Sequence, residues 1–477
     1  MNSKKVFSGF LWRFAERCGA QSVAFIVSIV LARLLDPDTY GTIALITVFI
    51  TILNVFVDSG MGNALIQKKT ADELDFSTVF YFNIFSCSIL YLVIFITAPL
   101  IAEFYNRQEL IPLVRVLSLT VVISGVKNIQ QAYVSCHMLF KKFFFSTLAG
   151  TIGAAIIGIA MAYLGFGVWA LVAQQLFNTL VDTVVLWSTV EWKPIKKFSF
   201  ERLKQLFDFG WKLLVSSLIN TLYSNIRSLI IGKKYSASDL AYYNQGNKFP
   251  NVIITNVNNS IDSVLLPAMA SEQDNTERVK SMTRRSIKMS TYIIAPLMMG
   301  LVFVATPLVR LVLTEKWLPC VPYLRIFCIT YIFYPMHTAN LNAIKALGRS
   351  DLFLKLEIAK KILGMFLLLV SMWFGVMAMA YSLLIADVVS QVINSWPNRT
   401  LLQYSYNEQM RDIAPNIFLA VVMGLVISIV PIFAKSDIFI LFLQLLIGGV
   451  VYVEGSLVFK LDSFSYLLEI VKYYIKR

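Results

Sequence analysis

The segment "LLDPDTYGTIAL" (residues 34–45) decides the fold, because a related segment, "KYSASDLAYYNQ" (residues 234–245), follows at a shift of 200 residues. In both, a short turn is followed by a small residue, Gly41 or Ala241, that opens an apolar run. Two further pairs occur in the same order at similar shifts: "RVLSLT" (115–120) with "RIFCIT" (325–330), and "FGVWA" (166–170) with "FGVMA" (374–378). Three matches in one order predict that the chain contains a duplicated unit.

The composition predicts that this unit lies in a membrane. Of the 477 residues, 57% are hydrophobic and only 15% are charged, which excludes an ordinary soluble protein. Apolar runs of about 20 residues, the length that crosses a bilayer as a helix, recur along the whole chain. We predict fourteen spans, at residues 10–35, 41–66, 77–103, 112–137, 145–163, 167–190, 209–232, 240–266, 288–313, 319–344, 354–373, 376–396, 413–433 and 437–459.

The predicted fold is all-α, with two six-helix lobes and two extra C-terminal helices. Because six is even, both lobes insert in the same orientation and form a parallel tandem repeat. The basic tail after the last span has the spacing of an amphipathic interfacial helix. The expected parts are an N-terminal lobe at 1–190, a cytoplasmic linker at 191–208, a C-terminal lobe at 209–396, two further spans at 413–459 and a cytoplasmic tail at 460–477.

The net charge of +14 is explained by membrane orientation rather than by nucleic acid. With a cytoplasmic N-terminus, 28 of the 42 Lys and Arg residues lie on the cytoplasmic side and 9 on the other. Both termini are therefore expected in the cytoplasm. The first apolar run is charged and lacks a cleavage site, so it is interpreted as a span and not as a signal peptide. The five cysteines show no metal-ligand spacing and are expected to be buried.

Polar residues at helical spacing mark the face of a span that is turned away from lipid. Such stripes occur in spans 1, 2, 7 and 8, and they include Gln21, Asn54, Asp58, Asn220, Ser224, Asn251, Asn258 and Asp262. One interpretation is a polar cavity. The other is hydrogen bonding between neighbouring helices, and for the Ser, Thr and Asn residues both stay open. Similar stripes in spans 6 and 12 favour packing.

Five basic residues inside spans are assigned to neither side of the membrane: Arg13, Arg17, Lys127, Arg227 and Lys248. A cation inside a bilayer is costly, so it needs an interfacial, protein or ligand partner. Arg13 and Arg227 are close enough to a span end to reach the interface, whereas Arg17 lies deeper. A cavity lined by these cations would attract anions, and Arg suits phosphate in particular. Asp58, Asp262 and Glu454 are candidates for ion coupling, and the sequence does not choose among them.

Several segments resemble the Wzx-type polysaccharide flippases, which belong to the polysaccharide transporter branch of the MOP exporter superfamily. The resemblance covers about residues 1–400 and is strongest over the first 70. Ala241 departs from it, because relatives usually have Gly there. The segments that carry it include "VLARLLDPDTYGTIAL", "DSGMGNALIQKK", "APLIAEFYN", "GFGVWALVAQQL", "WKPIKKFSF" and "SLIIGKKYSASDLAYYNQGNKFP".

The resemblance implies a MATE/MOP-like fold with a cavity lined by spans 1, 2, 7 and 8. It also implies an inner-membrane exporter that moves undecaprenyl-diphosphate-linked oligosaccharides to the outer leaflet by alternating access. Expected partners are this lipid-linked substrate, the bilayer and other polysaccharide assembly proteins, such as a polymerase or a chain-length regulator; no cofactor, metal or nucleic acid is expected. The expected cavity residues are Arg13, Arg17, Gln21, Asn54, Asp58, Lys127, Asn220, Ser224, Arg227, Lys248, Asn251 and Asn258.

Two other functions are weighed against this one. A MATE-like multidrug or small-molecule antiporter would share the architecture, but cationic drugs favour an acidic cavity, and the cations named above oppose that. A membrane enzyme would need a large external loop or a catalytic cluster. The outer connections are short, and His137 and His337 have no acid or nucleophile pattern beside them in the sequence, so no enzymatic activity is expected.

Overall fold

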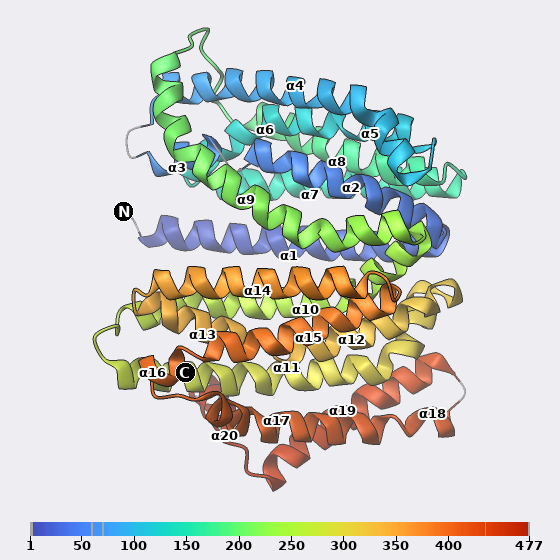
Figure 1. The fold of residues 1–477 in the computed structure, drawn as a ribbon, viewed down its shortest axis with the longest axis vertical. Coiled ribbons are helices and arrows are strands. Elements are labelled where there is room, and N and C mark those ends of the chain that lie inside the picture. The colour runs from blue at the N-terminus through green and yellow to red at the C-terminus, as the bar shows by residue number, and fades with distance from the viewer. Residues whose placement is uncertain (1–2, 59–60, 69–70, 435, 476–477) are drawn as a thin grey trace. The chain divides into compact units, whose positions relative to one another are not determined.

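The structure is a computed structural model that describes residues 3–58, 61–68, 71–434 and 436–475. Within these ranges it consists of helices and short connections and contains no strand, which confirms the predicted all-α class (Figure 1). By packing, the chain divides into two compact units, residues 1–241 and 242–477, and each unit is described by itself. The lobe boundaries drawn from the repeat, at residues 190 and 209, stay a prediction.

The first unit contains the helices of the first seven predicted spans. Their bounds are α1 (Ser3–Leu34), α2 (Pro37–Asp58), α3 (Met61–Gln67), α4 (Glu73–Tyr105), α5 (Leu110–Leu117), α6 (Leu119–Cys136), α7 (Phe140–Tyr163), α8 (Val168–Thr189) and α9 (Phe200–Lys234). Within this unit α1 packs along α7, and α9 packs against α2, α3 and α4.

The second unit contains the remaining spans. Their helices are α10 (Ala237–Ala270), α11 (Thr276–Leu313), η1 (Glu315–Cys320), α12 (Val321–Ile332), α13 (Tyr334–Ala346), α14 (Ser350–Ser371), α15 (Val376–Ser395), α16 (Asn398–Leu401), α17 (Tyr406–Ile427), α18 (Val430–Phe433), α19 (Asp437–Val458) and α20 (Asp462–Ile475). In this unit α17 and α19 pack against α11 and against each other, and α20 also contacts α11.

Three predicted spans are not single helices. The span predicted at 41–66 ends at Asp58, and α3 is a separate short helix; the glycine at residue 60 of the sequence favours such a stop. The span at 112–137 breaks at Ser118, whose hydroxyl donates to the Arg115 carbonyl instead of leaving the helix regular. The span at 319–344 begins as η1 and breaks again at Phe333, two residues before Pro335.

The helix boundaries confirm the predicted duplication. Helices α1 and α9 end at Leu34 and Lys234, and α2 and α10 begin at Pro37 and Ala237, so both pairs keep the shift of 200. Further along, α6 and α13 end at Cys136 and Ala346, and α7 and α14 begin at Phe140 and Ser350, at a shift of 210. The two copies of the repeat therefore begin and end these helices at matching positions.

Side-chain contacts recur as well. The Arg115 guanidinium donates through Nε to the Phe95 carbonyl at 3.2 Å, linking α5 to α4. Arg325, its counterpart at a shift of 210, donates through Nε to the Val302 carbonyl at 3.1 Å, linking α12 to α11. Because the two arginines make the same kind of contact, the two copies resemble each other in side-chain packing as well as in the lengths of their helices.

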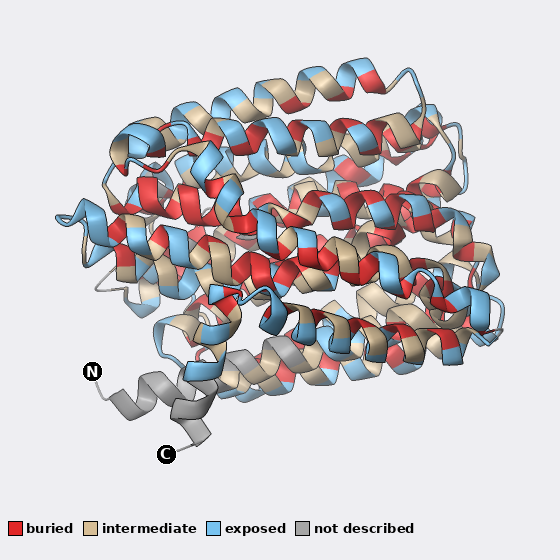
Figure 2. Cartoon of the chain, turned by 90° about the horizontal axis from the view of Figure 1, so that it is seen from below, coloured by how far each residue is buried: buried red, intermediate tan, exposed pale blue. Residues whose placement is uncertain are grey.

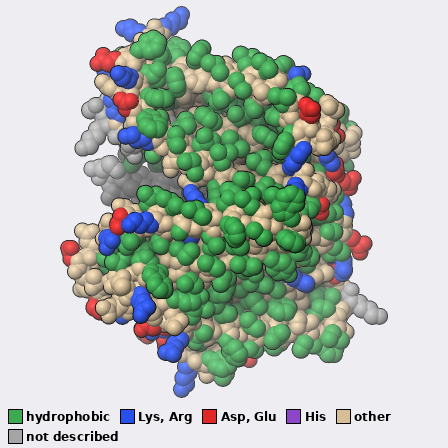
Figure 3. Space-filling view, in the orientation of Figure 1, with side chains coloured by type: hydrophobic (Ala, Val, Ile, Leu, Met, Phe, Trp, Pro, Cys, Tyr) green, Lys and Arg blue, Asp and Glu red, His purple; other side chains and the backbone are tan. Residues whose placement is uncertain are grey.

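The hydropathy of the described helices supports a multi-pass membrane protein. Ten spans are long and apolar enough to cross a bilayer, by length and composition. The four other predicted spans correspond to α1, α9, α10 and α14: the apolar part of α1 that the structure describes in full, Gly19–Leu34, is short, and polar or charged residues lower the hydropathy of the other three. In each unit, charged side chains gather near the two ends of the helices and hydrophobic ones cover the region between them (Figure 3). This distribution is typical of a protein embedded in lipid.

The turn after α4 ties α2 to α5 in the first unit. The Arg107 guanidinium donates to both Asp38 carboxylate oxygens, at 2.7 and 3.1 Å, and to the Thr42 hydroxyl at 2.7 Å. Because its hydrogen bonds to Asp38 favour the charged form, the pKa of Arg107 lies above its ordinary value. This bidentate pair fixes the first turn of α2, the segment that the repeat singles out.

The linker after α8 is held against the first unit by a buried carboxylate. Asp75, fully buried at the start of α4, accepts from Lys68 at 2.6 Å and from Arg202 at 3.1 Å. Nearby, the amides of Ile195 and Ser199 donate to side-chain hydroxyls of α4. Phe76, Phe80 and Trp192 form an aromatic cluster beside it. Along the helices of the chain, buried residues alternate with exposed ones (Figure 2). The residues predicted as a linker are thus ordered structure.

Candidate functional site

Two of the predicted cavity cations lie in α1, but their side chains are outside the described part of the structure. These are Arg13 and Arg17; the side chain of Asp58, the last residue of α2, is outside it too. Neighbouring side chains of α1 show which helix it packs on. Glu16 accepts from the Thr147 hydroxyl of α7 at 3.3 Å, and Trp12 packs on Phe144. The binding roles of Arg13, Arg17 and Asp58 stay predictions.

The polar stripe of α9 is exposed within the first unit. Asn220 and Ser224 are both exposed, and so is Gln21 of α1. Ser224 and Asn225 donate to the Thr221 carbonyl of their own helix, at 3.0 and 2.9 Å. Because these bonds are made inside α9, they do not explain the stripe as a seam to another helix. The cavity interpretation of this stripe stays a prediction.

Two further predicted residues of the first unit have buried polar atoms without a partner. The Asn54 side-chain oxygen in α2 and the Arg227 Nε in α9 are both buried, and neither has a hydrogen bond among the described residues. A buried polar atom that stays unsatisfied costs about 1–3 kcal/mol. Such atoms are usually satisfied by water or by another polar group, and the binding roles of Asn54 and Arg227 stay predictions.

The fourth predicted cation of the first unit, Lys127, has a protein partner. Its Nζ in α6 donates to an Asp182 carboxylate oxygen in α8 at 3.0 Å, and the side chains are 18% and 12% exposed. Asp182 therefore balances this cation. Lys127 is therefore a packing residue in this conformation, although the second Asp182 oxygen is buried without a partner.

In the second unit, the stripe of α10 divides into two kinds of residue. Tyr331 and Thr338 donate to Asn247 and Asn258, at 2.7 and 2.6 Å, and Asn342 donates to Asp262 at 2.7 Å. The last two bonds join residues exactly 80 apart, as two parallel helices in fixed register would do. Asn258 and Asp262 thus belong to a seam between α10 and α13, which is the helix-packing alternative.

The other predicted residues of α10 lie outside this seam. Asn251 is exposed and accepts only from Thr255 of its own helix, at 3.3 Å, while Lys248 is partly buried next to Phe249 and Pro250 in the sequence. Asn251 is therefore the α10 residue that best keeps the cavity interpretation. Glu454, the third candidate for ion coupling, is exposed on α19, and nothing in the structure selects it or Asp262 for that role.

One buried polar cluster was missed as a unit by the sequence reasoning. His337 Nε2 in α13 lies 3.3 Å from an Asp387 carboxylate oxygen in α15, and its Nδ1 is 2.7 Å from the Asn394 amide. At the shift of 210, His337 corresponds to Lys127 rather than to His137, and both residues face a carboxylate from the sixth helix of their lobe. The shift of 210 relates the two cationic positions, but Asp387 and Asp182 differ by 205, so the shift alone could not have paired His337 with its carboxylate.

The described residues contain no group of three or more His, Cys, Asp or Glu side chains that could hold a metal ion. Cys87, Cys320 and Cys328 are buried free cysteines, as expected, whereas Cys136 is exposed and departs from that expectation, because it ends α6 at a surface turn. The polar side chains of the site are mostly neutral and can donate or accept, which suits sugar hydroxyls better than it suits one fixed ion.

The fold resembles that of solved transporters. The inward closed conformation of the lipid II flippase MurJ superposes with a TM-score of 0.77, covering 94% of this chain and 98% of that one at 15% identity. An inward-facing multidrug resistance MATE family transporter of the MOP superfamily gives a TM-score of 0.64 over 82% of this chain and 98% of that one, also at 15% identity. At such identities the likeness shows the fold alone, and it confirms the predicted MATE/MOP-like architecture.

Sequence relatives are named for polysaccharide biosynthesis. The chain is 27% identical to the teichuronic acid biosynthesis protein TuaB of Bacillus subtilis, over 80% of this chain and 79% of the relative. It is 25% identical to the lipopolysaccharide biosynthesis protein WzxC of Escherichia coli, over 84% and 80%. The family model described as polysaccharide biosynthesis protein matches residues 30–322, which is more than half of the chain. The protein therefore belongs to the polysaccharide biosynthesis protein family of multi-pass membrane proteins.

Proposed function

We propose that the protein is a flippase that moves undecaprenyl-diphosphate-linked oligosaccharide repeat units from the inner to the outer leaflet of a bacterial inner membrane. The observation that carries this proposal is the exposed, mostly neutral polar stripe of α9, together with the unsatisfied Arg227 Nε, inside a chain of this family. Neutral side chains offer adaptable hydrogen bonds to sugar hydroxyls, and a guanidinium suits diphosphate.

The names of the relatives support this substrate class. A succinoglycan biosynthesis transport protein, ExoT of Rhizobium meliloti, is 24% identical over 69% of this chain and 67% of its own length. The relatives that are named for a polymer thus concern different polysaccharides, which favours a carrier that tolerates varied sugars. We expect the lipid-linked phosphate to be the constant element and Arg13 and Arg17 to bind it. Both termini would lie in the cytoplasm, and polymerase or chain-length proteins would act on the product.

The duplication supports alternating access as the mechanism. Two similarly folded units can exchange roles at the two membrane faces, as in transporters built from parallel repeats. The substrate's headgroup would move along a path lined by polar residues of spans 1, 2, 7 and 8, while its lipid tail stays in the bilayer. Because a multidrug antiporter could share this fold, substrate chemistry rather than architecture has to decide between the two functions.

The test is flipping of a fluorescent diphosphate-linked oligosaccharide by the full chain in sealed vesicles, read as protection of the sugar from an added glycosidase. We expect protein-dependent flipping that Arg17→Gln slows by at least about tenfold, the loss of one charge-assisted contact. Arg33→Gln, at the other end of α1, is the matched control and should keep the rate.

Two results would contradict the proposal. Vesicles with folded protein that flip no faster than empty vesicles, under proton, sodium or no gradient, would remove the flippase function. Equal rates for wild type and Arg17→Gln would leave that function standing but remove the role of Arg17. Imposing each gradient on variants Asp58→Asn, Asp262→Asn and Glu454→Gln separates the three candidates for ion coupling.

A further inference from the structure

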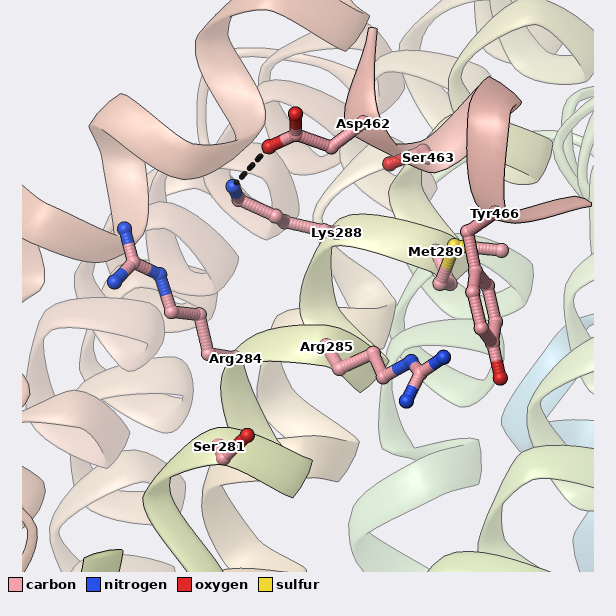
Figure 4. Close-up of a pocket in the computed structure, with 8 residues that line it drawn as sticks. All are labelled: Ser281, Arg284, Arg285, Lys288, Met289, Asp462, Ser463 and Tyr466. Atoms are coloured by element: carbon pink, nitrogen blue, oxygen red, sulfur yellow. Dashed lines mark hydrogen bonds and ion pairs between the residues drawn. The ribbon is translucent and has the colours of Figure 1, made fainter. Parts of the chain in front are cut away.

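A pocket unrelated to the α9 stripe lies in the second unit, between the start of α11 and the amphipathic helix α20. It has a volume of about 310 Å³ and is lined by Ser281, Arg284, Arg285, Lys288, Asp462 and Tyr466, among others. At ~30 Å³ per water molecule, this is the space of roughly ten waters. Figure 4 shows three basic side chains from one stretch of α11 around it and Tyr466 of α20 as the opposite wall.

Two of the three cations in this pocket are paired with carboxylates. Arg284 Nε lies 2.7 Å from an oxygen of the nearly buried Asp412, and Lys288 Nζ lies 3.1 Å from Asp462 and 3.4 Å from Asp412. The Lys288–Asp462 pair joins α11 to the first turn of α20, as the dashed line in Figure 4 marks. The pairs with Asp412 join α11 to α17, and the pair with Asp462 joins α11 to α20, so together they fix the walls of the pocket.

Arg285 is the cation that remains. Its guanidinium lies 3.5 Å from the centre of the Tyr466 ring, and it has no carboxylate within 4.0 Å and no hydrogen-bond acceptor among the described residues. Contact with an aromatic ring orients a guanidinium and still leaves its N–H groups free to donate. The arrangement therefore presents an oriented, unneutralised donor group at the wall of a pocket.

The pocket lies where α11 changes from charged to apolar. Residues 276–288 carry five Lys and Arg residues, whereas residues 289–309 carry no charged side chain. In α20, Phe464, Leu467 and Leu468 provide apolar side chains at helical spacing, as in helices that lie in the bilayer interface. A change of this kind marks the boundary between hydrocarbon and headgroups, so the pocket opens at the depth of lipid phosphates.

We propose that this pocket binds the phosphate of an anionic phospholipid headgroup, with Arg285 as its main donor and Tyr466 as the residue that positions it. Lys288 and Arg284 add positive potential, and the bound lipid fastens α20 to the membrane surface next to α11. An anionic lipid fits better than a zwitterionic one because the three cations Arg284, Arg285 and Lys288 outnumber the two carboxylates Asp412 and Asp462, which leaves the charge of Arg285 uncompensated.

The experiment is native mass spectrometry of the purified full chain, titrated with phosphatidylglycerol, with phosphatidylcholine of the same acyl chains, and with inorganic phosphate. We expect tighter retention of phosphatidylglycerol, weakened about tenfold by Arg285→Gln, since a hydrogen bond to a charged group is lost. Arg278→Gln is the matched control, because Arg278 lies on the same helix, is exposed and pairs with Glu272 outside the pocket. Its affinity should equal that of wild type.

Thermal unfolding of each variant shows whether it is folded, and Tyr466→Leu gives a second, milder change that should weaken phosphatidylglycerol binding less than Arg285→Gln does. The proposal is overturned if phosphatidylcholine binds as tightly as phosphatidylglycerol, or if Arg285→Gln and Arg278→Gln behave alike. It is also overturned if inorganic phosphate binds in an Arg285-dependent manner while phosphatidylglycerol does not, because the site would then recognise free phosphate rather than a lipid.

Discussion

Met138 has a left-handed backbone conformation, and the residue at the corresponding position of the other lobe is a glycine. Its φ is 54°, and Gly348, at a shift of 210, has a φ of 71°; both follow the last residue of α6 or α13 by two positions. The left-handed region costs a residue with a Cβ roughly 1–2 kcal/mol. Met138→Gly should therefore raise the free energy of unfolding by about 0.5–1 kcal/mol after the entropy cost of glycine, measured by thermal unfolding in detergent.

Gly348→Ala is the opposite test at the corresponding turn of the second copy, and it should lower the free energy of unfolding by a similar amount. The turns have the same backbone hydrogen bonds, with the amides of Leu139 and Arg349 donating to the carbonyls of Val134 and Ile344. A stabilising Gly348→Ala, or a destabilising Met138→Gly, would show that side-chain packing outweighs backbone strain at these positions.

Lys127 tests whether an intramembrane cation is structural or binds substrate. Lys127→Met would leave the Asp182 carboxylate partly buried without its ion-pair partner, so we expect a loss of about 3 kcal/mol in stability. The double variant Lys127→Met/Asp182→Leu should recover most of it, because replacing a whole buried pair by apolar groups is often neutral. Thermal unfolding gives the stability, and the vesicle assay is run on the double variant. Flipping at the wild-type rate would show that Lys127 holds helices together and does not bind the substrate.

At the level of helices, the spans could be predicted and their neighbours could not. Apolar runs of bilayer length locate nearly every helix. They do not predict the break at Ser118, where the side-chain hydroxyl donates to the Arg115 carbonyl. Likewise, the sequence places Asn251 and Asn258 in the same polar stripe of α10. Only the fold distinguishes exposed Asn251 from Asn258, which accepts from Thr338. Sequence periodicity predicts which residues share one face of a helix, but only the packed structure shows what that face contacts.

The start of α2 depends on a glycine that permits close packing. A Cβ on Gly41 would lie 1.8 Å from the Ala237 carbonyl oxygen, a backbone atom that cannot turn away as a side chain would. Gly41→Ala should therefore lower stability by about 1–3 kcal/mol through overpacking. Gly449→Ala in α19 is the matched control, since a Cβ there meets nothing within 4 Å. Equal melting temperatures for the two variants would mean that the α2 turn moves without cost.

For the whole molecule, the two copies of the repeat differ where function would require it. Both conserve their turns and the Arg115 and Arg325 contacts, which serve folding. The residues at a shift of 200 from Arg13 and Arg17 are Leu213 and Ser217, so this predicted pair of arginines has no counterpart in the second copy. The duplication thus explains why the two copies share a fold, and we expect the residues that differ between the copies to determine where a charged substrate binds.

The orientation of the whole chain gives the last prediction. We predict fourteen spans and cytoplasmic termini, and this topology would place the turn before α5 outside and the turn before α11 in the cytoplasm. Gln108 and Gln273 are exposed residues of these turns, so Gln108→Cys and Gln273→Cys form a matched pair. Buried Cys87, Cys320 and Cys328 can stay, while Cys18 and Cys136 are changed to Ser. A membrane-impermeant maleimide should label Gln108→Cys in intact cells and Gln273→Cys only after permeabilisation. The reverse pattern would invert the topology, and the sorting of basic residues would then need another explanation than the positive-inside rule.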